Sequence, residues 1–400
     1  MHEHIAILLV TIVILGYGYI SKFLRRSNIS GPMVFTAVGI LLSPLVLGVV
    51  DTKPDGEFIT IIAEIALIFV LFTDASSLNL KQLNWAIPTR LLFIGLPLTI
   101  VFATVVGVFI FPQESMLYAL LLALLLAPTD AALGKAVVSD KDVPLKIRSA
   151  INVESGLNDG IVFPVLLGVL ALITKTQDSS DSTYWLLFVL QQIVIGAVVG
   201  AITGYFNAKI SSILIDREDV EVTYKNLLPL AMAILAYYAA ENFAGNGFIA
   251  AFFAGLFLGN FNEELKENAD NFAESESELL LLICFMVFGF TFIPEAMLFW
   301  DIKVFIYSIL SLTLLRMLPV ALSLIGSKLD METVLFIGWF GPRGIASVLY
   351  ILIVVHAVVD IKGHETIYSV ATLTIFMSIF LHGLSAKPLV KLYSKNHKDM

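Results

Sequence analysis

The sequence predicts an all-α polytopic membrane protein with 13 transmembrane helices. Of its 400 residues, 58% are hydrophobic and 14% are charged, and the mean hydropathy is +0.90. Roughly a quarter of the residues are charged in soluble domains, so this composition is typical of a chain that lies mostly in lipid. Apolar stretches near the bilayer-spanning length of about 20 residues recur along the whole chain.

The predicted spans follow one another with short polar breaks between them. We place them at residues 5–21, 32–50, 58–76, 90–111, 115–138, 147–173, 184–208, 226–243, 246–261, 277–299, 303–325, 331–356 and 364–388. The first span has no basic segment before it and no small-residue cleavage site after it, so we expect a retained helix. The segments 207–225 and 262–278 are predicted to be short amphipathic or coil linkers in the cytoplasm, and no soluble domain is expected.

The distribution of basic residues predicts the orientation of the chain. With the N-terminus outside, 18 of the 24 Lys and Arg residues lie on the cytoplasmic side and four lie outside. The remaining two, Arg316 and Arg343, fall within spans. By the positive-inside rule, we expect a multi-pass protein of the cell inner (plasma) membrane with an external N-terminus and a cytoplasmic C-terminus.

Composition also excludes several classes of function. The net charge of −9 comes without a basic patch, so no nucleic-acid partner is expected. The single Cys284 rules out an intramolecular disulfide and a cysteine metal cage. Because no glycine-rich nucleotide fingerprint is present, we expect neither ATP-driven transport nor a cofactor.

Thirteen spans divide into two inverted six-helix repeats joined by the seventh span, 184–208. Each repeat carries two glycines eight residues apart in its second span, Gly31 and Gly39 in one and Gly247 and Gly255 in the other. The fifth span of each repeat is also interrupted, at Pro128-Thr129-Asp130 in 115–138 and at Gly341-Pro342-Arg343-Gly344 in 331–356. Paired interruptions of this kind indicate the binding site of a transporter.

Charged side chains near these interruptions predict the chemistry. A charge at the bilayer centre costs at least about 2.5–3.5 kcal/mol, so such residues mark functional sites. Proline removes a helix hydrogen bond and leaves free carbonyls. We expect Asp130 and Asp159 to meet where the spans 115–138 and 147–173 cross, with Ser155 one turn before Asp159.

Carboxylate, hydroxyl and carbonyl oxygens form a hard cage suited to Na⁺ or a similar ion. Burial raises the pKa of a carboxyl group, so a proton can compete with the cation for the same oxygens. Mutually exclusive binding of the two ions predicts secondary antiport of a monovalent cation against H⁺. The chain is then a transporter and not an enzyme.

Four runs carry a family resemblance: LFTDASSLNL (71–80), APTDAALGKAVVSD (127–140), RSAINVESGLNDG (148–160) and WFGPRGIASVLY (339–350). They closely resemble the bacterial monovalent cation:proton antiporter-1 family, relatives of the sodium/proton exchangers. The resemblance implies a homodimer that works by elevator-like alternating access. It implies dimerisation helices at about 1–88 and 226–299, a mobile ion-translocating core at about 89–174 and 300–390, and a linker helix at about 184–208.

The resemblance also implies roles for individual residues. Asp159 and Asp130 are expected to bind the cation, Na⁺ in the first instance, with oxygens from Thr129 and Ser155. Asn158 resembles the asparagine associated with electroneutral exchange. This chain has Thr73-Asp74 where some relatives have a glutamate beside a glycine, so the resemblance leaves a ligand from span 58–76 unsupported.

Other polar residues have competing interpretations. We favour a structural ion pair of Glu154 with Arg316 over direct ion binding by Glu154. We expect Arg343 to satisfy its own interrupted helix, with Glu154 as a competing partner. Glu64 and Asp74 are candidates for lining a funnel. In addition, His356 and His382 are weaker candidates for pH sensing.

Several alternatives of function remain. A K⁺/H⁺ antiporter of the same family is the alternative to Na⁺/H⁺ exchange, since cavity size and hydration decide the cation. An intramembrane aspartyl protease also needs two aspartates, although the Gly-x-Gly-Asp context of that class is missing. A cation channel would usually have a filter repeated in identical subunits. Saturable uptake driven by a pH gradient separates these classes.

Overall fold

The computed structural model describes residues 2–49, 57–80, 85–130, 133–174, 182–268, 274–357 and 365–396, and within these ranges the regular structure is helical. The helices are α1 (His2–Arg26), α2 (Gly31–Leu42), α3 (Glu57–Ser76), α4 (Ala86–Arg90), η1 (Leu91–Gly95), α5 (Leu96–Ile110), α6 (Met116–Leu126), α7 (Lys135–Val138), α8 (Leu145–Thr174), α9 (Ser182–Asp216), α10 (Val222–Asn242), α11 (Gly247–Phe261), α12 (Glu263–Asn268), α13 (Glu274–Val287), η3 (Phe288–Phe292), α14 (Ile293–Met297), α15 (Ile302–Leu312), α16 (Leu314–Ser323), α17 (Met331–Trp339), α18 (Ile345–Ala357) and α19 (Glu365–Asn396).

Six helical stretches in the described chain are long and apolar enough to cross a membrane: Ala86–Ile110, Leu145–Thr174, Leu187–Asp216, Glu276–Met297, Ile302–Ser323 and Glu365–Lys395. Shorter apolar helices accompany them, among them α2, α6, α11 and α18. The protein is therefore an all-α, multi-pass membrane protein, as the composition predicted.

Some predicted boundaries were wrong. The span placed at 32–50 ends as a helix at Leu42, because Ser43 precedes Pro44 and takes an extended conformation (ψ 167°). The span placed at 184–208 continues to Asp216 as α9, and the last helix continues to Asn396. The acidic linker at 262–278 contains a short helix, α12. Hydropathy locates the apolar part of a helix but not the turns that extend into water.

Both predicted interruptions are present. The chain leaves helical geometry after Leu126 and again between α17 and α18. A third interruption, at Thr313 (φ −115°, ψ −95°), separates α15 from α16 and was not predicted. Arg316 lies in the first turn after it.

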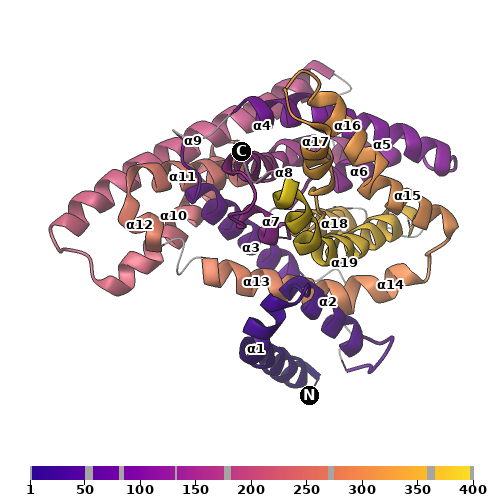
Figure 1. Cartoon of the computed structure of the whole chain (residues 1–400), viewed down its shortest axis with the longest axis horizontal. Helices are drawn as coiled ribbons and strands as arrows, with labels where there is room; N and C mark the ends of the chain where they lie inside the picture. Colours follow the sequence, from indigo (N-terminus) through magenta and orange to yellow (C-terminus); the bar gives the residue numbers. More distant parts are fainter. Residues whose placement is uncertain are drawn as a thin grey trace.

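The helices are arranged in two groups on either side of α3 and α8 (Figure 1). One group contains α9 to α12, and the other contains α5, α6 and α15 to α19. At the edge near the N-terminus, α1 and α2 lie beside α13 and α14 (Figure 1). Since α8 packs against α6, α11 and α18, it brings the interrupted helices into the interior.

Candidate functional site

The two interrupted helices cross in the interior of the protein. The first non-helical segment begins at Ala127, and the second spans residues 340–344. One backbone hydrogen bond joins them, from the N–H of Asp130 to the carbonyl oxygen of Pro342 at 2.8 Å. Pro128 and Pro342 therefore mark a real crossing, as the paired interruptions in the sequence indicated.

The carboxylate of Asp130 holds the crossing together. Its Oδ2 accepts the N–H of Ile345, the first residue of α18, at 2.8 Å, and its Oδ1 accepts the N–H of Leu133 at 3.3 Å. The first N–H groups of a helix have no partner within the helix and favour a negative charge. Asp130, only 5% exposed, thus caps α18 from the other interruption.

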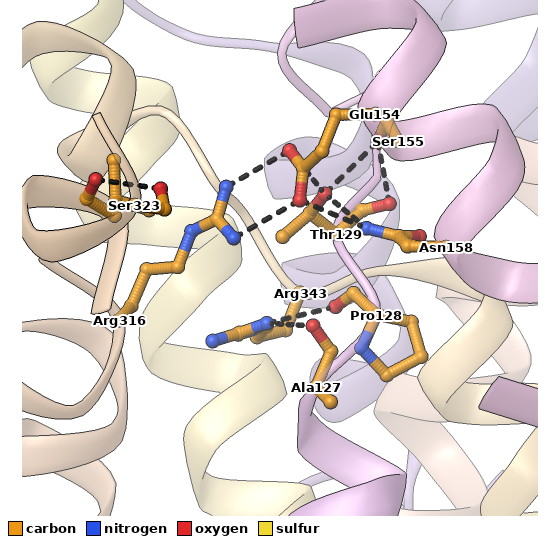
Figure 2. A network of polar contacts seen from close by, with 10 residues as sticks. Ala127, Pro128, Thr129, Glu154, Ser155, Asn158, Arg316, Ser323 and Arg343 are labelled. Carbon is orange, nitrogen blue, oxygen red and sulfur yellow. Dashed lines mark hydrogen bonds and ion pairs between the residues drawn. The ribbon is translucent and has the colours of Figure 1, made fainter. Parts of the chain in front are cut away.

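Arg343, from the second interruption, donates hydrogen bonds to free backbone carbonyls of the first interruption (Figure 2). Its Nη1 donates to the carbonyl oxygens of Ala127 at 2.6 Å and Pro128 at 3.0 Å. The expectation that Arg343 satisfies its own helix was wrong, because the guanidinium group reaches across the crossing to the end of α6. The last carbonyls of a helix lack partners and favour a cation.

Glu154 and Arg316 form a buried ion pair (Figure 2). The guanidinium group donates two hydrogen bonds, Nη1 to Oε1 at 3.0 Å and Nη2 to Oε2 at 2.9 Å. Both side chains are 1% exposed. The pairing of Glu154 with Arg316, favoured over Arg343 from the sequence, is confirmed as a contact.

Thr129, Ser155 and Asn158 connect the interruption after α6 to α8 (Figure 2). The Ser155 hydroxyl donates to the Thr129 carbonyl oxygen at 2.5 Å, and Asn158 Nδ2 donates to Thr129 Oγ1 at 2.8 Å. Asn158 Nδ2 also lies 3.3 Å from Glu154 Oε1. These polar side chains are buried, and they fix the unwound segment against the helix that carries Asp159.

Asp159 differs from the other two acidic residues. It is 3% exposed, and its Oδ1 has no hydrogen-bond partner among the described residues. The side-chain oxygen of the preceding Asn158 is likewise without a partner. Asp130 and Glu154 are close enough to Asp159 to act on it electrostatically. Asp159 is therefore the buried carboxyl group whose oxygen is available to a ligand.

Tyr350 supports Asp159, and the sequence analysis missed it. Its hydroxyl donates to the Asp159 carbonyl oxygen at 2.6 Å, and its ring stacks on Phe163 with centroids 5.4 Å apart. The sequence did contain a signal for this role, namely a tyrosine inside an apolar span. A buried tyrosine hydroxyl usually finds a hydrogen-bond partner.

Of the two candidate pH sensors, His382 and His356, the structure describes the side chain of His382. His382 is buried, and its Nδ1 lies 3.1 Å from the hydroxyl of Ser378, which accepts the N–H of Arg343 at 2.6 Å. His382 thus supports the crossing. The side chain of His356 lies outside the described part of the structure.

Glu64 and Asp74, the candidates for lining a funnel, both lie in α3. Glu64 accepts a hydrogen bond from the Tyr237 hydroxyl of α10, and Asp74 lies half-buried in the last turns of α3. The carboxylates that act on Asp159 are Asp130 and Glu154. Glu64 is thus engaged by α10.

The donor set defines what the site can bind. Among the described residues, no three His, Cys, Asp or Glu side chains gather in a geometry that could hold a metal ion. A cation at Asp159 would thus complete its shell with hydroxyl, amide and carbonyl oxygens. Hard oxygens of this kind suit a monovalent cation better than a transition metal.

The chain matches known proteins along most of its length. A family model described as "Sodium/hydrogen exchanger, transmembrane" matches residues 7–392. The chain is 26% identical over 394 residues to the K⁺/H⁺ antiporter NhaP of Alkalimonas amylolytica and covers 66% of that protein. It is also 26% identical over 426 residues to a Na⁺/H⁺ antiporter of Schizosaccharomyces pombe, of which it covers 90%. The alignments include 95% and 97% of this chain.

The fold is also similar to that of a solved protein. The sodium proton antiporter MjNhaP1 from Methanocaldococcus jannaschii at pH 8 superimposes with a TM-score of 0.79 and 20% identity. The match covers 98% of this chain and 99% of the other.

Proposed function

This chain belongs to the sodium/hydrogen exchanger family, and we propose that it exchanges a monovalent cation for H⁺ across the membrane. The observation that carries the proposal is Asp159, a buried carboxyl group whose Oδ1 lacks a partner among the described residues, beside the crossing of two interrupted helices. The K⁺/H⁺ and Na⁺/H⁺ antiporters to which the chain is similar support the same class of function.

The proposed mechanism is competition at Asp159. A carboxylate away from water binds either a proton or a dehydrated cation, and one excludes the other. Asn158, Ser155 and Thr129 supply neutral oxygens for the cation, and Asp130 adds a second negative charge. Exchange follows if the site changes the side it faces only when one of the two ions is bound.

The proposed architecture is 13 spans in two inverted repeats. The packing of the glycines supports it, because the two repeats use them reciprocally. Gly39 of α2 lies against Met286 and Gly289, and Gly255 of α11 lies against the backbone of Phe72 in α3. In each case the second span of one repeat packs on the third span of the other.

The proposed motion is an elevator-like movement of the core, about 89–174 and 300–390, against the helices at about 1–88 and 226–299. The position of α10 to α12 on one side of α3 and α8, and of α5, α6 and α15 to α19 on the other, supports this division (Figure 1). We further propose a homodimer with an external N-terminus and a cytoplasmic C-terminus in the inner (plasma) membrane. The charge bias of the loops supports that orientation.

Na⁺ is the cation that we propose first. The fission-yeast relative, covered over 90% of its length, is a Na⁺/H⁺ antiporter, and the structural match is to a sodium proton antiporter. K⁺ is the second candidate, because the relative from Alkalimonas amylolytica is a K⁺/H⁺ antiporter. Adding Na⁺, K⁺ and Li⁺ in turn to proteoliposomes with an imposed pH gradient distinguishes them.

The deciding experiment compares Asp159→Asn with Asp301→Asn in these proteoliposomes. The first change removes the exchangeable proton and is expected to abolish cation-dependent dissipation of the pH gradient. Asp301 caps α15 by accepting the N–H of Val304 at 2.8 Å, and asparagine caps equally well, so Asp301→Asn should exchange normally. Coupled exchange by purified Asp159→Asn protein would refute the shared site.

A further inference from the structure

One face of α19 holds both ends of the second interruption. Ser378, His382 and Ser385 are four and three residues apart, so they lie along one side of the helix. The Ser378 hydroxyl accepts the N–H of Arg343 at 2.6 Å. At the other end, Trp339, the last residue of α17, donates its Nε1–H to the Ser385 hydroxyl at 2.9 Å. The segment between Trp339 and Arg343 is therefore attached to α19 at both ends.

His382 lies between these two attachments and contacts both. Its Nδ1 is 3.1 Å from the hydroxyl oxygen and from the carbonyl oxygen of Ser378, and its ring centroid is 5.0 Å from that of Trp339. The imidazole is 2% exposed, and its Nε2 has no hydrogen-bond partner among the described residues. Nδ1 is therefore the atom through which the imidazole acts on the second interruption.

The contact with His382 sets the direction of the Ser378 hydroxyl. Hydroxyl groups inside helices often bond the carbonyl oxygen one turn earlier, as Thr374 of α19 does with Val370 at 2.7 Å. The Ser378 hydroxyl instead contacts the imidazole one turn later and accepts the N–H of Arg343. Without the imidazole nitrogen the hydroxyl group can turn back along its own helix. The buried N–H of Arg343 then loses its acceptor, which is costly away from water.

Arg343 transmits its position to the ion site in two ways. Its Nη1 donates to two backbone carbonyls of the first interruption. Two residues later, the N–H of Ile345 donates to the carboxylate of Asp130. A shift of the Arg343 backbone therefore displaces both contacts, and with them the carboxylate that acts on Asp159.

The arrangement on α19 has a counterpart on α8. After the first interruption, α8 carries Ser155 and Asp159 four residues apart, and after the second, α19 carries Ser378 and His382 with the same spacing. Ser155 bonds the backbone of the first interruption, as Ser378 bonds that of the second. In the proposed inverted repeat, His382 thus corresponds to Asp159, with an imidazole where the first repeat has a carboxylate.

We propose that His382 is a positioning residue for exchange. Through Ser378 it fixes the backbone of Arg343, and it thereby sets the geometry in which Asp130 and Asp159 meet the cation. This inference rests on the proposed function. The role depends on the hydrogen bond of Nδ1 and needs no change in the protonation of the ring.

The test is the KM for Na⁺ in proteoliposomes with His382→Leu and with His382→Asn. Leucine removes the ring nitrogen, whereas asparagine places an amide group near the position of Nδ1. We expect His382→Leu to raise the KM by on the order of threefold to tenfold, and His382→Asn to stay within about twofold of the wild type. Ser378→Ala should raise the KM as His382→Leu does. The double variant should show no further rise, because both changes release the same N–H.

The matched control is Thr374→Val, which removes a buried hydrogen bond within α19 and should lower the melting temperature without changing the KM. An unchanged KM of folded His382→Leu protein would overturn the inference. Equal rises for leucine and asparagine, or additive rises in the double variant, would also overturn it. If His382→Leu does not fold, Ser378→Ala decides, and an unchanged KM for that variant counts against the inference. Absence of exchange by the wild type with Na⁺, K⁺ or Li⁺ would instead refute the proposed function itself.

Discussion

At the scale of single residues, the pair of Glu154 and Arg316 is the clearest case of mutual dependence. Both are 1% exposed, and removing one partner leaves the other charged and buried. We expect Glu154→Ala and Arg316→Ala each to lower the free energy of unfolding by about 3–5 kcal/mol. Thermal unfolding in detergent measures this, and the double variant should lose less than the sum of the single losses.

An exposed ion pair serves as the control. Lys225 and Glu264 lie 2.8 Å apart, but their side chains are 20% and 49% exposed. Water and salt screen such a pair, so its coupling should be below about 1 kcal/mol. Equal coupling energies for the two pairs would contradict the interpretation of Glu154 and Arg316 as a buried structural unit.

Asp130 and Asp159 should respond differently to the same substitution. The two oxygens of Asp130 accept N–H groups from Ile345 and Leu133, whereas an asparagine offers only one acceptor oxygen. We therefore expect Asp130→Asn to lower the free energy of unfolding by about 1–3 kcal/mol. Asp159→Asn should leave stability nearly unchanged, because Oδ1 has no partner among the described residues. The melting temperatures of the purified proteins compare the two, and a reversed order would disprove this assignment.

Two buried tyrosines, Tyr350 and Tyr307, allow a test of whether Tyr350 positions Asp159. Tyr350 donates to the Asp159 carbonyl oxygen at 2.6 Å, and Tyr307 donates to the Ala103 carbonyl oxygen at 3.0 Å. Replacing either by phenylalanine removes one hydrogen bond, worth about 1 kcal/mol. We expect Tyr350→Phe to raise the KM for the cation several-fold and to shift the pH profile of exchange. Tyr307→Phe should change stability alone, and identical kinetics for the two variants would rule out positioning by Tyr350.

At the scale of helices, the two interruptions that contain proline were predictable, but the one at Thr313 and the contacts across the crossing were not. Pro128 and Pro342 lie in the unwound segments, where each is followed by a polar residue, whereas the prolines inside α8, α10, α16 and α19 do not interrupt their helices. Proline followed by a polar residue, and not proline alone, is therefore the more useful signal. The partners across the crossing depend on how α6, α8 and α18 pack, which no local pattern encodes. For this reason the predicted hydrogen-bond partner of Arg343 was wrong, and Tyr350 was missed. The contact of Glu154 with Arg316, in contrast, followed from the need to pair buried charges.

Helix contacts at glycine make the next prediction. A Cβ on Gly255 of α11 would overlap the backbone carbonyl of Phe72 in α3, whereas a Cβ on Gly16 of α1 would meet nothing within 4 Å. Gly255→Ala should therefore lower the free energy of unfolding by about 1–3 kcal/mol through overpacking. Gly16→Ala should be neutral or stabilising, by up to about 1 kcal/mol. Thermal unfolding in detergent compares them, and equal melting temperatures would show that α11 and α3 are not held in close contact.

At the scale of the whole molecule, the buried charges of the site nearly cancel. Arg316 is paired with Glu154, and Arg343 lies at the same crossing as Asp130. This leaves the single charge of Asp159, which either a monovalent cation or one proton neutralises. Asn158 is an amide, where a second aspartate would carry another exchangeable proton.

The last prediction is that exchange is electroneutral, one cation for one proton. The moving core then carries the same charge in both directions, and the membrane potential does no work on the cycle. With two protons per cation, about 2.3 kcal/mol would be available for each net charge at 100 mV. We expect the rate of Na⁺/H⁺ exchange in proteoliposomes to be the same at zero potential and at a large negative potential clamped by K⁺ and valinomycin. Vesicles with Asp159→Asn protein measure the leak to be subtracted. A rate that changes with voltage, or a current proportional to turnover, would show that a second proton takes part, and Glu154 would be the first carboxyl group to examine.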